Sequence, residues 1–275
     1  MIFQLHKPAF PLNRFVEHLV YFDGTSATHN LDRFLPDGNT ELIIDLTESP
    51  QYIYDNETLR EIQTCRHAWV SGVRTQPITI PSGRGSRMLI VAFKKGGGFP
   101  FYPFPMNELT DTVAEAGGVF GMDFHLLREQ LLASKSIERM FQMVEAFLIQ
   151  RLDETIPDST PTRCVEYALA SIVSDPGSRC LYQLSDQIGY SQKHLIDLFR
   201  QQVGVAPKQY LRIMRFQKVI RALENSQAIR WSQVALESGY YDQAHLIHDF
   251  KFFSGFTPTE YLQRKSSLLN YIAVQ

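Results

Sequence analysis

Residues 184–261 carry one pattern twice, and this internal repeat limits the fold more than any other feature of the sequence. The first half of the pattern recurs at an offset of 50 residues and the second half at 51, so the second copy has one extra residue just after its turn. The matched positions are Leu184-Ser185 with Val234-Ala235, Gly189-Tyr190 with Gly239-Tyr240, and Leu195, Phe199, Gly204, Pro207 and Tyr210 with Leu246, Phe250, Gly255, Pro258 and Tyr261. Such self-similarity indicates two copies of one supersecondary unit.

Each copy is predicted to be a short helix, a glycine-containing turn and a second helix, which is the sequence form of a helix-turn-helix motif. Ser191 and Asp242 stand where they can cap the second helix of each copy. The motifs are expected at 181–202 and 231–253, and a long helix at 207–224, opened by a proline, is expected to join them. The whole region 163–275 is predicted to be helical.

The stretch YDQAHLIHDFKFFSGFTP, residues 241–258, shows how the second helix of a copy divides its faces. Leu246, Phe250 and Phe253 recur at helical spacing and predict a buried face. The side chains that point elsewhere are Gln243, His245, Ile247 and His248. In a helix-turn-helix motif the second helix enters the major groove of DNA, where each base pair displays a distinct pattern of donors and acceptors. These side chains are therefore candidate base contacts.

Two stretches, LSDQIGYSQKHLIDLFRQQVGVAPKQYL and VALESGYYDQAHLIHDFKFFSGFTPTEYL, resemble the paired helix-turn-helix domain of AraC/XylS-type transcriptional regulators. The second is the more specific, through its A-x-x-x-G-Y, Asp-Gln, Leu and Phe positions and its G-x-x-P ending. The resemblance covers about 80 to 100 residues. It implies a regulator that binds double-stranded promoter DNA, with two reading helices held roughly 34 Å apart, about one DNA turn.

The resemblance also assigns individual contacts. The implied base contacts are Lys193, Ile196 and Asp197 in the first unit and Gln243, Ala244, His245, Ile247 and His248 in the second. The candidate phosphate contacts are Ser191, Arg200, Lys208 and Arg212. Gln243 suits adenine, Lys193 suits guanine, and either isoleucine suits a thymine methyl group. Asp197, His248 and Asp249 depart from the family, which commonly has more basic or polar residues there.

Two of these assignments have plainer alternatives. Lys193 and Asp197 are four residues apart, so they could form a surface ion pair worth a few tenths of a kcal/mol. His245 and His248 are three apart on one helix and could bind a metal ion, although no cysteine or carboxylate cluster supports a metal site. DNA contact remains the preferred interpretation, and no metal or cofactor is expected.

The first 100 residues are predicted to be rich in β-strands, which makes the chain an α+β protein with a cupin-like barrel or sandwich before an all-helical domain. Strands are expected at 40–46, 51–55, 67–73, 76–81 and 86–93. Trailing helices are expected at about 123–152, and the polar segment 153–162, with two prolines, is the expected linker between domain 1–152 and domain 163–275. In the resembling family, such N-terminal domains sense ligands.

Four aromatic side chains of this domain, Tyr52, Tyr54, Trp69 and Phe93, are candidates for an effector pocket, with burial in the core as the competing interpretation. Two other functions stay open. The domain could be an enzyme that uses Cys65, whose neighbours Arg66 and His67 could activate a thiol, or it could serve only to form a ligand-independent dimer. A second copy of the chain and RNA polymerase are further candidate partners.

The charge distribution agrees with DNA contact at one end of the chain. Residues 163–275 hold 13 Lys and Arg against 9 Asp and Glu, whereas the rest holds 14 against 20. A basic segment beside an acidic one predicts that only the former meets a polyanion. Cys65, Cys164 and Cys180 are scattered and odd in number, and no signal peptide or membrane span is evident, so a cytoplasmic, non-enzymatic protein is expected.

Overall fold

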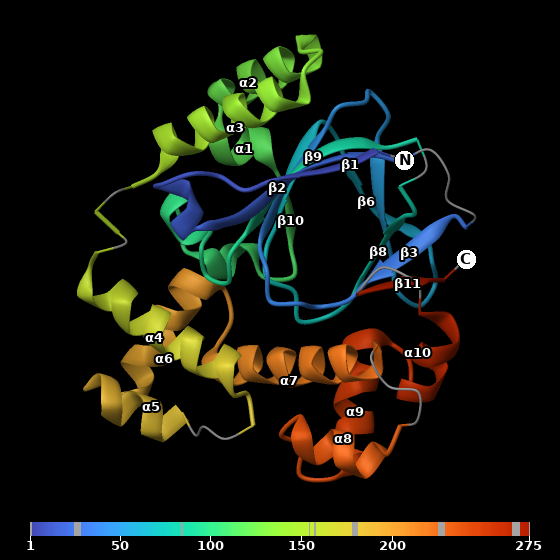
Figure 1. The fold of residues 1–275 in the computed structure, drawn as a ribbon, viewed down its shortest axis with the longest axis vertical. Helices are drawn as coiled ribbons and strands as arrows, with labels where there is room; N and C mark the ends of the chain where they lie inside the picture. The colour runs from blue at the N-terminus through green and yellow to red at the C-terminus, as the bar shows by residue number, and fades with distance from the viewer. Residues whose placement is uncertain are drawn as a thin grey trace.

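The computed structural model describes residues 2–24, 29–83, 85–153, 155–156, 158–177, 181–224, 229–265 and 270–274. Two antiparallel sheets form the N-terminal domain, and helices form the C-terminal domain beneath it (Figure 1). The predicted α+β class, with a β-rich domain followed by a helical one, is confirmed.

The strands of the N-terminal domain form two sheets. The first has the order β1-β2-β9-β4-β7-β10, with β1 Ile2–His6, β2 Val16–Asp23, β9 Arg87–Phe93, β4 Glu41–Asp45, β7 Ala68–Ser71 and β10 Val113–Glu115. The second has the order β11-β3-β8-β5-β6, with β11 Tyr271–Ala273, β3 Leu31–Phe34, β8 Ile78–Pro81, β5 Gln51–Tyr54 and β6 Glu61–Cys65. The five strands predicted from the sequence correspond to β4, β5, β7, β8 and β9.

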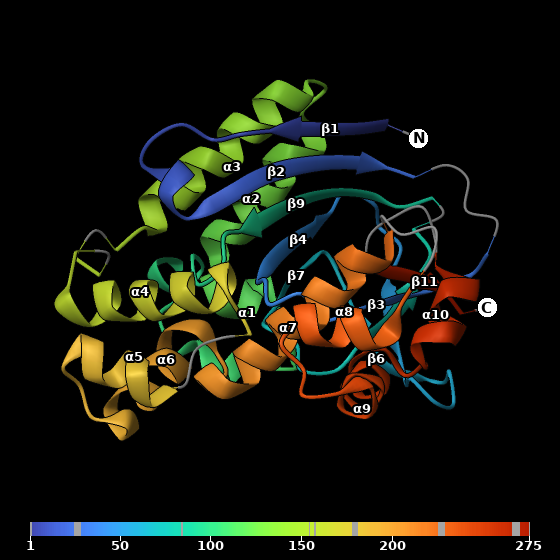
Figure 2. The same cartoon turned by 60° about the horizontal axis from the view of Figure 1, so that its bottom comes forward.

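Three helices cover the outer face of the first sheet. They are α1 Ala116–Phe120, α2 Met122–Ala133 and α3 Ile137–Arg151, close to the predicted trailing helices. Figure 2 shows β1, β2, β9 and β4 in this order with α2 and α3 beside them. Strand β4 is buried along almost its whole length because helices cover one face of the sheet and the second sheet covers the other.

The C-terminal domain is built around one long helix. The helices of this domain are α4 Thr160–Ser174, α5 Leu181–Ile188, α6 Gln192–Val203, α7 Pro207–Glu224, which is the long one, α8 Trp231–Glu237, α9 Gln243–Ser254 and α10 Pro258–Arg264. Figure 1 shows α7 running between the group α4–α6 and the group α8–α10. Buried side chains of α7, among them Ile213, Phe216 and Ile220, pack in one core with those of both groups.

The two domains share buried contacts along α7. The Tyr210 hydroxyl donates to the carbonyl of Gly38 (3.1 Å), and the Gln217 amide donates to the carbonyl of Pro36 (2.7 Å). Gly38 has φ +80°, and a Cβ atom there would lie 2.8 Å from Met214 and 2.9 Å from the Tyr210 hydroxyl. Glycine adopts a positive φ without strain and has no Cβ atom to collide with α7. Gly38 therefore allows the loop between β3 and β4 to contact α7 directly.

The prediction of helix throughout 163–275 was wrong in one place. Residues 271–273 form strand β11, which pairs antiparallel with β3, placing Tyr271 opposite Phe34 and Ile272 opposite Arg33. Ile272 is fully buried in the core of the C-terminal domain. Three residues are too few for a periodic signal, and the strand forms because β3 offers it an edge. The C-terminal segment thereby completes a sheet of the N-terminal domain.

Candidate nucleic-acid interface

The two predicted helix-turn-helix units are present as α5–α6 and α8–α9, and their turns match at backbone level. The Tyr190 amide donates to the Ser185 carbonyl (3.2 Å), and the equivalent Tyr240 amide donates to Ala235 (2.9 Å). The glycine before each tyrosine has a positive φ, +77° at Gly189 and +86° at Gly239. Glycine adopts this conformation without the steric cost other residues incur, so the repeated Gly-Tyr fixes the repeated turn.

The second helix of each unit begins with the predicted cap. The Ser191 hydroxyl accepts from the His194 amide (3.2 Å), and the Asp242 carboxylate accepts from the His245 amide (2.8 Å). In both units the histidine ring meets the preceding tyrosine edge-on, with Tyr190–His194 centroids 4.7 Å apart and Tyr240–His245 centroids 5.1 Å apart. The hydroxyl proton of Ser191 is not used in the cap and can still be donated to a phosphate oxygen.

The buried faces of α6 and α9 hold them to the rest of the domain. Leu195 and Phe199 of α6 are fully buried, as are Leu246 and Phe253 of α9. The ring of Phe216 on α7 lies 5.2 Å from both Phe250 and Phe253, between ring centroids. The predicted core stripe of α9 is therefore confirmed, and α7 packs against the second helix of each unit.

The predicted base contacts lie on the faces that this packing leaves open. Lys193 and Asp197 of α6 are exposed, as are Gln243, Ala244, His245 and His248 of α9. Ile196 and Ile247 are half-buried, and Ile247 packs against the core. Among the ion pairs of the described residues, none joins Lys193 to Asp197, so both remain available for other partners.

The candidate phosphate contacts differ in what else they do. Arg200 and Lys208 are exposed. Arg212 instead forms a two-point ion pair with Asp249, with Nη2 2.9 Å from Oδ1 and Nε 3.3 Å from Oδ2. Its guanidinium also lies over the rings of Phe252 and Phe253, at 5.0 and 5.3 Å from their centroids. This arginine therefore has a structural role within the domain.

Asp249, one of the residues that depart from the family pattern, does not lie on the surface beside His248. It is 3% exposed and is neutralised by Arg212 from α7. Its carboxylate lies 3.7 Å from Nδ1 of His248 and 4.0 Å from Nε2 of His245. The departure from the family pattern is thus a buried link between α7 and α9, and this acid does not present its charge to a DNA groove.

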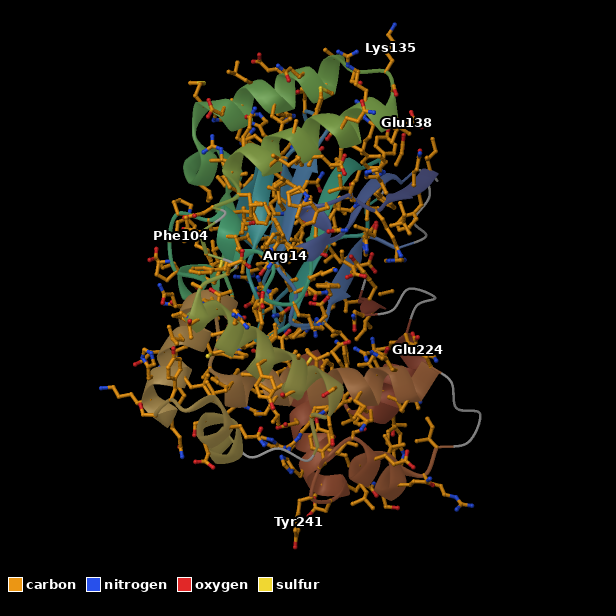
Figure 3. The ribbon with its side chains drawn as sticks, turned by 60° about the vertical axis from the view of Figure 1, so that its left-hand side comes forward. Arg14, Phe104, Lys135, Glu138, Glu224 and Tyr241 are labelled. Carbon is orange, nitrogen blue, oxygen red and sulfur yellow. The ribbon has the colours of Figure 1, made fainter. Side chains whose placement is uncertain are left out.

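One exposed residue of the second unit was missed from the sequence. Tyr241 is 89% exposed, and Figure 3 shows it at the end of the molecule opposite Lys135. It comes directly before the cap Asp242 and is the one residue of the second copy that has no equivalent in the first. A phenol at this place can donate to a phosphate. The change of offset from 50 to 51 was the signal for it.

The four candidate effector residues do not all line one pocket. Tyr52 and Trp69 line a cavity of about 130 Å³ between the two sheets, whereas Phe93 is buried with Phe101 and Tyr102 in the core under α1–α3. Tyr54 packs edge-on against Tyr52 but does not line this cavity.

The surroundings of Cys65 do not favour the alternative that its thiol is a catalytic nucleophile. Cys65 is buried at the cavity wall, and burial, with Glu115 nearby, raises its pKa to about 11. A nucleophilic thiol needs a lowered pKa. Cys164 is half-buried, and Cys180 lies outside the described residues.

Among the described residues there is neither a metal-ligand cluster nor a membrane-spanning helix. No group of three or more His, Cys, Asp or Glu side chains there could hold a metal ion. No helix in that part of the chain has both the length and the apolar character needed to cross a membrane.

Comparisons with known proteins agree with this geometry. Residues 184–264 match a family described as a helix-turn-helix domain, and residues 4–115 match a domain of unknown function, DUF6597. The chain is 27% identical over 124 residues to an uncharacterized HTH-type transcriptional regulator, YbfI, of Bacillus subtilis, covering 44% of each protein. It is 32% identical over 100 residues to an uncharacterized HTH-type transcriptional regulator of Haemophilus influenzae, covering 36% of this chain and 33% of that one. The match thus spans less than half of either relative.

A solved structure, that of ToxT from Vibrio cholerae, aligns over 96% of this chain and 98% of its own, with 9% identity and a TM-score of 0.47. The family match at 184–264 covers both units described above, from α5 into α10. Residues 184–264 therefore form a helix-turn-helix domain of the AraC type, and both paired motifs lie within it.

Proposed function

We propose that this protein regulates transcription by binding double-stranded promoter DNA in a sequence-specific manner, with α6 and α9 in two successive major grooves. One observation carries the proposal. Both helices are capped by equivalent residues, anchored to α7 by their buried faces, and open along the faces that bear the predicted base contacts. A helix held in this way presents its N-terminal side chains to base edges.

The roles of individual residues follow from their chemistry. Gln243 can bond an adenine at two points, and Lys193 can donate to a guanine. Arg200, Lys208 and Tyr241, all exposed, are proposed phosphate contacts that fix the register without reading sequence. Arg212 acts through Asp249 to hold α9 in place.

The N-terminal domain is proposed to bind an effector or a second copy of the chain. Its contacts with α7 and the pairing of β11 with β3 give it a physical connection to the DNA-binding domain. An effector would change DNA binding only if it bound two arrangements of the domains unequally.

The test is selection of binding sites from random duplex DNA with the full chain, followed by affinity measurements on the selected site over a salt series. A motif of two short blocks about 10 base pairs apart is expected, with affinity falling steeply as salt rises. Gln243→Ala and Lys193→Ala should each weaken the selected site by about 1 to 3 kcal/mol and relax preference at one block.

Matched controls come from the same helix and from the far side of the molecule. Gln201→Ala changes an exposed glutamine near the C-terminal end of α6, and Lys135→Ala changes a lysine at the end opposite the DNA-binding domain (Figure 3). Both should leave affinity and preference unchanged. If Gln243→Ala and Lys193→Ala also left both unchanged, the assigned base contacts would be wrong. If no motif were selected, the proposed function would fail.

A further inference from the structure

The cavity between the two sheets is lined on both sides by β-branched side chains. Ile43 and Ile90 line it from the first sheet, and Ile53 and Ile78 line it from the second. Its volume is about 130 Å³. An apolar cavity of roughly 150 Å³ accepts benzene, so this one suits a molecule of about six or seven non-hydrogen atoms.

Four aromatic side chains also line this cavity: Phe34, Tyr52, Trp69 and Tyr271. Each is half-buried, although all four lie between packed sheets. Phe34 and Tyr271 form a pair with ring centroids 5.0 Å apart. The faces of Trp and Tyr rings attract cations, and quaternary ammonium groups are recognised by several such rings together.

A single carboxyl group, that of Glu41, shares the cavity with these rings. Glu41 pairs with Ser71 across β4 and β7, two residues from the pair of Ile43 with Trp69, so the strand alternation directs all four side chains to one face. Within the described part of the chain, no basic side chain forms an ion pair with Glu41.

The surroundings of Glu41 disfavour its charged form. Burial, with Asp37 nearby, raises its pKa to about 8. A buried carboxylate that has no opposite charge beside it lowers the stability of the folded protein. A bound cation would remove this cost, because the carboxylate would gain an opposite charge and release its proton to solvent.

We propose that this cavity binds a small organic cation, a protonated amine or a quaternary ammonium compound, between the Glu41 carboxylate and the rings of Trp69 and Tyr271. The proposal names the chemical class of the effector and rests on the proposed function only for its consequence in the cell. Tyr271 belongs to β11, which follows α10 of the DNA-binding domain. The ligand therefore contacts the C-terminal strand β11 as well as strands from the first half of the chain.

The test is calorimetry of the full chain with choline, with its uncharged isostere 3,3-dimethylbutan-1-ol, and with the anion 3,3-dimethylbutanoate, all at pH 7.5 and without DNA. Choline should bind at least about tenfold tighter than the isostere. It should also release part of a proton, seen as a heat that depends on the ionisation enthalpy of the buffer.

Glu41→Gln should remove both the preference for choline and the proton release, while the isostere binds as before and shows that the cavity is intact. Glu61→Gln, an exposed carboxyl on β6, should change neither. Failure of choline to bind at millimolar concentration, equal or tighter binding of the isostere or the anion, or an unchanged preference in Glu41→Gln would each overturn the proposal. Because DNA is absent from this assay, these results are independent of whether a DNA motif is selected.

Discussion

Replacing Arg212 with methionine should destabilise the DNA-binding domain, because it leaves a buried carboxylate without its partner. Methionine keeps most of the apolar contact with Phe252 and Phe253 but removes the charge from the pair with Asp249. Removing one member of a buried ion pair typically costs about 3 to 5 kcal/mol. We expect a loss of about 3 kcal/mol, the low end, because polar ring nitrogens of His245 and His248 still lie 4.0 and 3.7 Å from the carboxylate of Asp249.

Replacing the other member of the ion pair, Asp249, should lower the free energy of unfolding by less. In Asp249→Asn the arginine is left with 28% of its side chain exposed and with two aromatic rings beneath it, so water can solvate its head. A loss of about 1 kcal/mol is expected. The asymmetry follows from burial, since the acid is almost fully enclosed and the arginine is not.

Urea denaturation followed by Trp231 fluorescence would measure both losses. Trp231 begins α8 and packs against the core of the DNA-binding domain. The chain has two tryptophans, so Trp69→Phe makes Trp231 the sole reporter. If Arg212→Met left stability unchanged and only lowered the salt dependence of DNA binding by about one phosphate contact, Arg212 would be a phosphate ligand and the structural argument would be refuted.

Three further outcomes follow from buried groups. The pKa of Glu41 is raised from 4.5 to about 8, so its contribution to stability is fully present below pH 4.5 and is lost as pH rises from there through 8; Glu41→Gln should match the wild type at pH 4 and exceed it at pH 9 by about 2 to 3 kcal/mol in urea denaturation, less than the full shift because the residue is only half-buried, and equal stability at both pH values would contradict the assigned burial. Burial raises the pKa of Cys65 from 9.0 to about 11, so iodoacetamide should modify it about 100-fold more slowly in the native than in the denatured protein at pH 8, and mass spectrometry showing equal rates would speak against an enclosed thiol. Ile272→Ala should cost about 2 to 4 kcal/mol and speed amide hydrogen exchange in β3, whereas unchanged exchange in Leu31–Phe34 would show that β11 does not hold this edge.

The helical domain was predictable because its signals are local. Caps, positive-φ glycines and the 3.6-residue spacing of Leu246, Phe250 and Phe253 all act within a few residues, and the repeat presents them twice. The bounds of the two helix-turn-helix units and of α7 accordingly agree with prediction to within a residue or so. The exposed candidates on α9 followed from the same spacing, whereas those on α6 were implied by the resemblance to AraC/XylS-type regulators.

The features that were not predicted correctly depend on contacts between residues that are far apart in the sequence. Strand β11 exists because β3 has an open edge, and Arg212 pairs with Asp249 across 37 residues of sequence. In both cases, the residues around one partner in the sequence do not indicate where the other partner lies. Phe93 and Trp69 are both aromatic residues on strands, but which sheet face each occupies decides whether it joins the core or the cavity.

The pairing of β11 with β3 has a consequence for the order of folding during synthesis. Phe34 emerges from the ribosome early, but its partner Tyr271 is made only after more than 230 further residues. At 5 to 20 residues per second, the outer edge of β3 stays unpaired for roughly 10 to 50 seconds. An unpaired strand edge is a template for association with other chains. The second sheet is therefore incomplete until β11 is made, which happens only after the helices that would bind DNA have been made.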